Sequence, residues 1–382
     1  MKKIIYTILS FGLFFLQSCG DIDDEYTYEE WTEVNWSAVA DSTTNSLIDR
    51  FWNTSGNYFN YGNDGTTIDF HYWPNAHAMD VLIDAYQRTN DTKYSAYFDK
   101  WHAGIKVKNG NTYKNDYVDD MEWNALTMLR IYDITKDVKY LDTAKELWGW
   151  IKDAWTEDAG GGITWCTNPN VLFTKNACSN GPAAIIGARM YNITNDQSDL
   201  EWAKKIYEWE KNTLVNRATG AISDHIVCET NEVKGVALTY NQGTYVGAAV
   251  ELFGITGDRT YLNEAQKVTN YTISSLINTS NNILRDEGNG DNGLFKGIFI
   301  RYFLELIKVN ELPDSYRNKY ITFFNNNANV LWSSGVYKED LLFGPAWDTA
   351  PVGITQLTSQ ASGCMMIEAK AAYERWETSQ KQ

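Results

Sequence analysis

Apolar residues recur at spacings of three and four along most of the chain, which is the pattern of amphipathic helices. Ala78, Val81, Leu82, Ala85 and Tyr86 mark one such segment. The pattern predicts an all-α protein. The expected helices cover residues 43–53, 75–88, 92–105, 119–134, 138–154, 180–194, 198–215, 241–256, 260–277, 293–308, 314–331 and 356–376.

Many of these helices are separated by a recurring junction. It reads ITKDVKYL at 134–141 and ITGDRTYL at 255–262, with related copies at 88–94 and 193–200 and a degenerate one at 309–316. Each copy has the residues of a helix end, a short turn and an Asp or Thr that caps the next helix. The junctions therefore predict helical hairpins.

Repeats of this size are typical of solenoids and of closed rings. Six hairpins can close into an (α/α)6 barrel, with an inner and an outer ring and all long loops at one end. The lone first helix then completes the last hairpin, which favours the barrel, although a solenoid stays open at this point. The long loops contain Trp73, Trp123, Trp165 and Trp347, and function tends to concentrate in such loops.

The N-terminus has a targeting pattern instead of a helical one. Lys2 and Lys3 precede an apolar run over 4–16, and Cys19 follows small residues, as in a bacterial lipoprotein signal. We expect residues 1–18 to be removed, a lipid on Cys19, an acidic tether over 19–40 and one domain over 41–378. An ordinary secretory signal is the alternative. No other stretch has the apolar length of a membrane span.

The acidic run at 21–25 resembles the surface-display signal of lipoproteins of the Bacteroidetes, although a solvated linker has the same composition. We therefore expect an outer-membrane lipoprotein that faces the cell surface, with the periplasmic face as the alternative.

Charge and composition narrow the class of ligand. A formal net charge of −16 disfavours nucleic acid as a partner. The chain has 15 Trp and 24 Tyr, whose flat rings with a polar edge suit the surface of a sugar, so a neutral glycan is favoured. We expect a monomer with no cofactor and no metal, since the acidic loop 286–293 lacks the spacing of known calcium loops.

Four cysteines remain beside Cys19, and none has the spacing of a zinc site. Two interpretations of Cys166 and Cys178 stay open: a disulfide, which the compartment permits, or two small buried thiols.

The adjacent acids Asp119 and Asp120 begin the helix predicted over 119–134. Cleavage of a glycosidic bond needs two carboxyl groups, which lie about 5–5.5 Å apart in retaining enzymes. The helix N-terminus stabilises one carboxylate, and the second, beside a like charge, keeps its proton more readily. Asp at a helix start is most often only a cap. The position on the loop-rich end of an inner helix favours catalysis.

The sequence also resembles glycoside hydrolase family 76, the bacterial α-1,6-mannanases. The matching stretches are WPNAHAMD at 73–80, DDMEW at 119–123, GGGITW at 160–165, KNACSNG at 175–181, YNQG at 240–243 and FKGIFIRY at 295–302. The resemblance implies an (α/α)6 fold and retaining, endo-type cleavage of α-1,6-mannan, with Asp119 as nucleophile and Asp120 as acid/base. Relatives often carry two tryptophans where this chain has Glu122 and Trp123, which leaves the exact sugar subsites open.

Other polar and aromatic residues near the loops are candidates for binding the sugar. His77 is either a sugar contact or a structural histidine. Lys296 and Arg301 are expected to pair with carboxylates such as Glu287 or Asp286. The complete set of expected substrate-binding residues is Trp73, Asn75, His77, Asp80, Trp123, Trp165, Asn176, Asn180, Asn241, Gln242, Lys296 and Trp347.

Two other functions fit the same sequence. A lipoprotein that only captures glycans would show the same anchor and aromatic loops, and other (α/α)6 barrels hydrolyse other neutral glycans. Only a hydrolase needs both Asp119 and Asp120 in the cleft.

Overall fold

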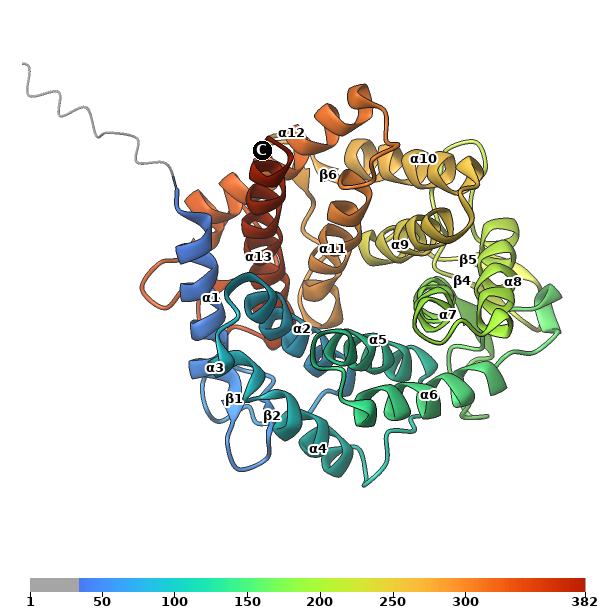
Figure 1. Ribbon diagram of the computed structural model, residues 1–382, viewed down its shortest axis with the longest axis horizontal. Helices are drawn as coiled ribbons and strands as arrows, with labels where there is room; N and C mark the ends of the chain where they lie inside the picture. The colour runs from blue at the N-terminus through green and yellow to red at the C-terminus, as the bar shows by residue number, and fades with distance from the viewer. Residues whose placement is uncertain (1–33, 382) are drawn as a thin grey trace, which may run out of the picture. The chain divides into compact units, whose positions relative to one another are not determined.

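The computed structural model describes residues 34–381. The predicted signal segment, Cys19 and most of the predicted tether lie outside the described residues. Figure 1 shows the folded unit as two concentric rings of helices. Within residues 34–381, no helix combines the length and the apolar character that crossing a membrane requires.

The inner ring contains every second long helix. Each inner helix contacts the next around the ring, and the last contacts the first, so the ring is closed. This closure confirms the predicted (α/α)6 barrel and excludes a solenoid. The inner helices are α2 (Tyr72–Thr89), α5 (Val118–Thr135), α7 (Gly181–Thr194), α9 (Thr239–Thr256), α11 (Phe295–Ile307) and α13 (Leu357–Gln380).

The outer ring pairs each inner helix with an antiparallel neighbour. Its helices are α1 (Trp36–Phe51), α4 (Phe98–Lys108), α6 (Val138–Asp153), α8 (Gln197–Thr213), α10 (Arg259–Ser275) and α12 (Asp314–Val330), with the short α3 (Thr92–Ser95) before α4. Three smaller 3-10 turns and one π turn occur at Asp158–Gly160, Ala177–Ser179, Gly290–Leu294 and Leu331–Gly335.

The repeated junctions turn the chain from inner to outer helices as predicted. Four inner helices end on a left-handed residue, namely Asn90, Lys136, Asn195 or Gly257. One residue later, an aspartate accepts a hydrogen bond from the backbone of the next helix, as Asp137 does from Lys139 at 3.1 Å. This side chain satisfies one of the free N–H groups of the helix start.

Two helix boundaries differ from the sequence expectation. Helix α1 begins at Trp36, because Asn35 caps it and the Trp36 side chain is buried, so residues 36–40 belong to the barrel and not to the tether. The segment predicted as one helix over 92–105 is broken after Ser95. Its first part is tied to α1 through Tyr94, which donates to Asp41 at 2.6 Å, and Gly104 of its second part lies against the Asn57 carbonyl.

Short antiparallel strands connect outer to inner helices, and the sequence analysis did not predict them. They are β1 (Trp52–Asn53) with β2 (Tyr58–Phe59), β6 (Ile277–Asn278) with β7 (Ile283–Leu284), and β8 (Val336–Tyr337) with β9 (Leu342–Phe343). A three-stranded sheet joins β3 (Thr174–Asn176), β4 (His225–Val227) and β5 (Glu232–Lys234) and pairs Asn176 with His225.

Buried amides of the inner helix starts hold the segments that precede them. Asn75 accepts from the N–H of Phe59 at 2.7 Å and donates to its carbonyl at 3.1 Å. Asn180 makes the same pair of bonds to Ile163, at 2.8 and 3.1 Å. Gln242 accepts from Ile222 and donates to Gly220, at 2.7 and 3.1 Å. An amide suits this position because it offers a donor and an acceptor on one plane.

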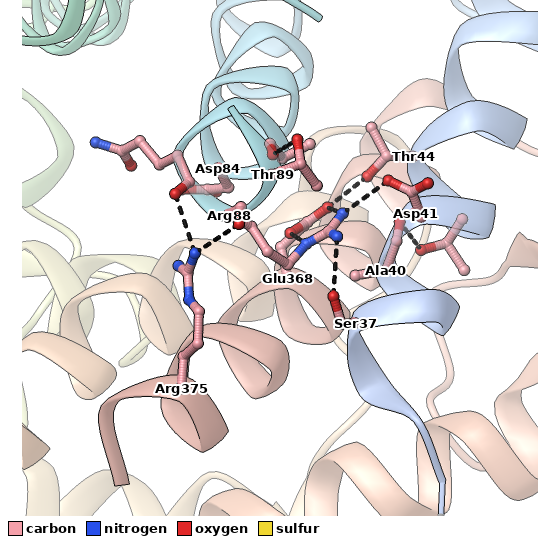
Figure 2. A network of polar contacts seen from close by, with 12 residues as sticks. Ser37, Ala40, Asp41, Thr44, Asp84, Arg88, Thr89, Glu368 and Arg375 are labelled. Carbon is pink, nitrogen blue, oxygen red and sulfur yellow. Dashed lines mark hydrogen bonds and ion pairs between the residues drawn. The ribbon is translucent and has the colours of Figure 1, made fainter. Parts of the chain in front are cut away.

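The ring closes through a buried ion pair between the first and last inner helices. Arg88 at the end of α2 binds Glu368 of α13 at 2.8 and 3.0 Å, and the same arginine contacts Ser37 and Asp41 of α1 at 3.2 and 3.3 Å. Figure 2 shows these groups converging from three helices. They lie at the end of the barrel where the inner helices finish. Arg301 lies at this end too and pairs with Asp84 at 2.9 Å, not with Glu287 or Asp286 as predicted.

Candidate active site

A cleft of about 940 Å³ occupies the end of the barrel where the inner helices begin. Inner helices contribute Trp73 from α2, Asp119, Asp120 and Trp123 from α5, Tyr240 from α9 and Phe295 from α11. The loops between them complete the walls. The predicted catalytic pair is therefore inside the main cleft of the loop-rich end.

The start of α5 is fixed from both sides. Asn115 accepts a hydrogen bond from the N–H of Tyr117 at 2.9 Å, and the carbonyl of Trp165 accepts one from the N–H of Val118 at 2.8 Å. The second bond also ties the glycine-rich loop to the helix. It brings the indole of Trp165 to Asp119, where Nε1 donates to Oδ2 at 3.3 Å.

Asp119 has the properties of a carboxylate that ionises near neutral pH. Burial raises its pKa to about 6, while the thiol of Cys178, the indole of Trp165 and backbone N–H groups oppose this shift because they stabilise the charged form. Its Oδ1 atom is buried and has no hydrogen-bond partner among residues 34–381. The Oδ2 atom is thus held by the indole of Trp165.

Asp120 differs from Asp119 in its surroundings. Burial raises its pKa well above the ordinary value, and the negative charges of Asp119 and Asp291 raise it further. Among residues 34–381, no hydrogen-bond donor stabilises the charged form of Asp120 in the way that Trp165 stabilises Asp119. The surroundings therefore make Asp120 hold its proton more tightly than Asp119, which is the arrangement that separates a nucleophile from a proton donor.

Aromatic side chains form the walls of the cleft. The rings of Tyr240 and Phe295 stack at 3.8 Å and 8°, and Tyr117 packs against Trp165 at 5.1 Å. The indole of Trp73 donates to Asp291 at 3.1 Å, which fixes the orientation of its ring. Such surfaces present flat apolar faces with polar rims, as sugar binding requires.

Four of the residues expected to bind the sugar line this cleft: Trp73, Trp123, Trp165 and Asn176. The other eight do not line it. Asn75, Asn180 and Gln242 are the buried amides that hold backbone segments, so their bonding capacity is used within the fold. Asn241 lies behind the wall and donates to Asp224 at 3.3 Å. An amide side chain can bond to a backbone N–H and C=O as readily as to a sugar hydroxyl. The sequence pattern therefore did not distinguish structural amides from sugar-binding ones.

The remaining expected residues also lie outside the cleft. Lys296 is buried and donates to the carbonyl of Pro345 at 2.5 Å, and its ammonium lies 5.3 Å from the ring centre of Trp347, which is buried as well. This lysine therefore holds the loop that contains Trp347 and does not pair with Glu287 or Asp286. His77 and Asp80 lie below the cleft floor.

Several cleft residues were not among the expected ones. His225 begins the central strand β4 of the three-stranded sheet, Asp224 immediately precedes it, and the two side chains contact each other at 2.8 Å. Asp291 comes from the acidic loop over 286–293, which we considered only as a calcium loop and from which we expected no site residue. Tyr240 and Phe295 lie in the stretches quoted above, and that was the available signal for them.

The cysteines in the described part of the chain are all free and buried, so the alternative of small thiols applies to Cys166 and Cys178. Within residues 34–381, no group of His, Cys, Asp or Glu side chains has the arrangement of a metal site.

Two further buried acids lie near the site. Glu122 of α5 and Glu210 of α8 are 0% exposed, and their carboxylate oxygens have no hydrogen-bond partner in the described chain. Burial raises the pKa of both well above the ordinary value, and the charges of Asp119 and Glu210 add to the effect at Glu122. Burial thus favours the protonated, neutral form of both side chains in the folded protein.

These two acids give a stability prediction. The unfolded chain releases their protons near pH 4.3, about the ordinary value for Glu, but the folded chain keeps them. Their contribution to stability is therefore full below that pH and is lost as the pH rises. We therefore compare the melting temperature of the double variant Glu122→Gln, Glu210→Gln with that of the wild type. We expect this difference to shift in favour of the double variant by several degrees when the pH is raised from 5 to 8.

Thermal unfolding followed by circular dichroism at both pH values measures this difference. Glu201→Gln, at an exposed position of α8, is the matched control and should show no gain. If the difference in melting temperature between the double variant and the wild type is the same at pH 5 and pH 8, the neutral state of the buried acids is contradicted.

Comparison with known proteins places the fold and the cleft in a family. The model of glycosyl hydrolase family 76 matches residues 34–382. The α-1,6-mannanase GH76A of Salegentibacter sp. HEL1_6 superposes with a TM-score of 0.84 and 42% identity, over 88% of this chain and 99% of that one. An inactive variant with two aspartates replaced by alanine was solved in complex with α-1,6-mannotetrose, at a TM-score of 0.84 and 41% identity over 89% and 99% of the chains.

A curated relative is the mannan endo-1,6-alpha-mannosidase DCW1 of Candida glabrata. It is 27% identical over 293 residues, which is 68% of this chain and 62% of that protein. The chain thus spans less than two thirds of that relative's length. The family match, in contrast, covers the whole barrel and includes the cleft with Asp119 and Asp120. The chain therefore belongs to glycoside hydrolase family 76.

Proposed function

We propose that this protein is a retaining, endo-acting hydrolase of α-1,6-mannosidic bonds in mannan. The observation that carries the proposal is the pair Asp119 and Asp120, adjacent on α5, open to the cleft and held in different environments. The choice of α-1,6-mannan is supported by the Salegentibacter mannanase and by the Candida glabrata relative, whose names state that bond.

The two carboxyl groups divide the reaction between them. In the first step the Asp119 carboxylate attacks the anomeric carbon and forms a glycosyl ester, while Asp120 gives its proton to the departing O6 of the next mannose. In the second step water attacks the same carbon, Asp120 takes up the proton of that water, and the ester bond to Asp119 breaks. Two inversions give net retention of configuration.

The protonation states required for these steps give a pH prediction. Catalysis needs Asp119 ionised, and its pKa is about 6, so we expect kcat/KM to rise as the pH increases through that value. Catalysis also needs the proton on Asp120, whose pKa is raised, so activity should fall again on the alkaline side. The initial rate of reducing-end release between pH 4 and pH 9 measures the profile. A rate that increases steadily with acidity below pH 5 would contradict the assigned roles.

The direct test of the function uses linear, debranched α-1,6-mannan. The soluble protein should release oligosaccharides of mixed length, because an endo-acting enzyme cuts inside the polymer, and the first product should have the α configuration by proton NMR. A lack of new reducing ends from this polymer, together with binding of it, would favour a capture protein. Cleavage of another neutral glycan alone would keep the hydrolase class and change the substrate.

We also propose that the protein is an outer-membrane lipoprotein anchored through Cys19 and displayed at the cell surface. The topology is compatible with this placement, because α1 begins at the end of the barrel opposite the cleft, where Ser37 contacts Arg88. Protease treatment of intact cells tests the display, since a periplasmic protein would survive it. Retention of the protein in membranes of a Cys19→Ala strain would contradict the anchor.

A further inference from the structure

His77 lies beneath the cleft and contacts two of its tryptophans. It is one helical turn below Trp73 on α2, and the two rings are perpendicular, with centres 5.6 Å apart and an interplanar angle of 86°. Its ring centre is 4.8 Å from that of Trp123 on α5. The side chain is only 3% exposed and does not line the cleft. His77 is therefore out of reach of a sugar but in contact with the surface that a sugar would meet.

The polar neighbours of His77 do not hold it by hydrogen bonds. Its Nδ1 atom is 3.8 Å from Asp80, and that carboxylate is already paired with Arg130 at 2.8 Å. Neither ring nitrogen has a hydrogen-bond partner among residues 34–381. Burial lowers the pKa of His77 to about 3, so the ring is neutral throughout the working range. The aromatic contacts of its flat ring are with the two indoles.

The two tryptophans connect this buried ring to the chemistry. Trp123 follows Asp119 by four residues on the same helix, so it lies one turn below the nucleophile on the same face. Trp73 is oriented at its other edge by Asp291, whose charge also acts on Asp120. A change in the packing under the indoles would therefore alter the cleft surface directly beside the acid pair.

We propose that His77 is a positioning residue that fixes the angle between Trp73 and Trp123 and so shapes the sugar-binding floor of the cleft. The proposal rests on the proposed mannanase function and goes beyond it, because it assigns the binding geometry to a residue that does not touch substrate. The shape of the ring carries this role and its nitrogens do not. Removal of the ring leaves space beneath two large side chains, which then adopt more than one orientation.

Three substitutions separate the ring from its nitrogens. His77→Phe keeps a flat ring, His77→Asn keeps a polar atom near the place of Nδ1, and His77→Ala removes both. We expect His77→Ala and His77→Asn to raise KM for mannan oligosaccharides roughly tenfold while kcat changes by less than about threefold, because sugar binding is lost and the acid pair is intact. His77→Phe should stay within about twofold of the wild type in both constants.

A second readout does not depend on activity. Quenching of tryptophan fluorescence by acrylamide, in protein without substrate, should increase for His77→Ala and His77→Asn and remain at the wild-type level for His77→Phe. Circular dichroism identifies a variant that fails to fold. If His77→Ala fails to fold, the comparison of His77→Phe with His77→Asn still shows whether the ring or its nitrogens hold the two tryptophans. Equal loss of binding in His77→Phe and His77→Asn would overturn the proposal, and so would unchanged quenching and KM in His77→Ala.

The two proposals fail in different ways. If the wild type hydrolyses no mannan, the mannanase function is wrong, and the fluorescence measurement still tests the role of His77. If the wild type cuts mannan but no variant changes KM or quenching, only the role of His77 is wrong.

Discussion

Replacement of Asp119 by alanine is expected to lower kcat on α-1,6-mannan by at least about a thousandfold. In the proposed mechanism this side chain supplies the nucleophile. The other carboxyl group of the cleft on the same turn of α5 is that of Asp120, whose raised pKa favours the protonated form. Binding should persist, because the aromatic walls and the Trp73–Asp291 contact are unchanged. Initial rates of reducing-end release, measured with enough protein to detect a residual rate, provide the test.

Asp120→Ala should also reduce hydrolysis of mannan, by roughly 10²–10⁴-fold, because proton donation to the leaving oxygen is lost. The two variants then differ on an aryl α-1,6-mannotrioside, whose phenolate departs without a proton. On this substrate Asp120→Ala should regain the first step, and added azide should accelerate turnover and give a glycosyl azide of retained configuration. Asp119→Ala should show no such recovery on the retaining route.

The matched control for this pair is Asp133→Asn. Asp133 lies on the same helix near its other end, with a side chain that is 69% exposed and paired with Lys136. Its substitution should leave kcat within about twofold of the wild type. If Asp119→Ala kept full activity, Asp119 would not be the nucleophile. If the aryl substrate restored activity to Asp119→Ala but not to Asp120→Ala, the two assigned roles would be reversed.

The helical part of this fold could be predicted from the sequence because helices leave a long, regular signal. Four of the five junctions repeat a capping aspartate, and a cap is visible in the sequence since only a few side chains can accept from the free N–H groups. The hairpins from outer to inner helices left no comparable signal. Strands such as Trp52–Asn53 are two residues long, too short for an alternating pattern to appear.

In the candidate site too, some residues could be predicted from the sequence and others could not. Two acids at a helix start are by themselves most often a cap. Asp119 and Asp120 became candidates because they begin an inner helix at the loop-rich end and lie in a stretch that resembles family 76. Asn75 and Gln242 were assigned to the sugar, although the fold uses them to bind Phe59 and Ile222. Asp291 was missed for a physical reason: its position beside Trp73 depends on contact between residues more than two hundred positions apart.

The closure of the ring gives the prediction with the largest expected effect on stability. Arg88 and Glu368 are 3% and 1% exposed, so their ion pair is buried and connects the first and last inner helices. Arg88→Met leaves the carboxylate of Glu368 buried with only the hydroxyl of Thr44 as partner, at 2.8 Å. Loss of one member of a buried pair typically costs about 3–5 kcal/mol. We expect a decrease of this size in the free energy of unfolding, measured by urea denaturation.

Two further variants distinguish the buried pair from an ordinary salt bridge. Arg50→Met removes the exposed pair with Asp340, whose side chains are 39% and 34% exposed, and should cost less than about 1 kcal/mol. The double variant Arg88→Met, Glu368→Met should recover most of the loss, because no uncompensated charge then remains in the core. A cost for Arg88→Met as small as that for Arg50→Met would mean that the apolar contacts between α13 and α2 close the barrel without this pair.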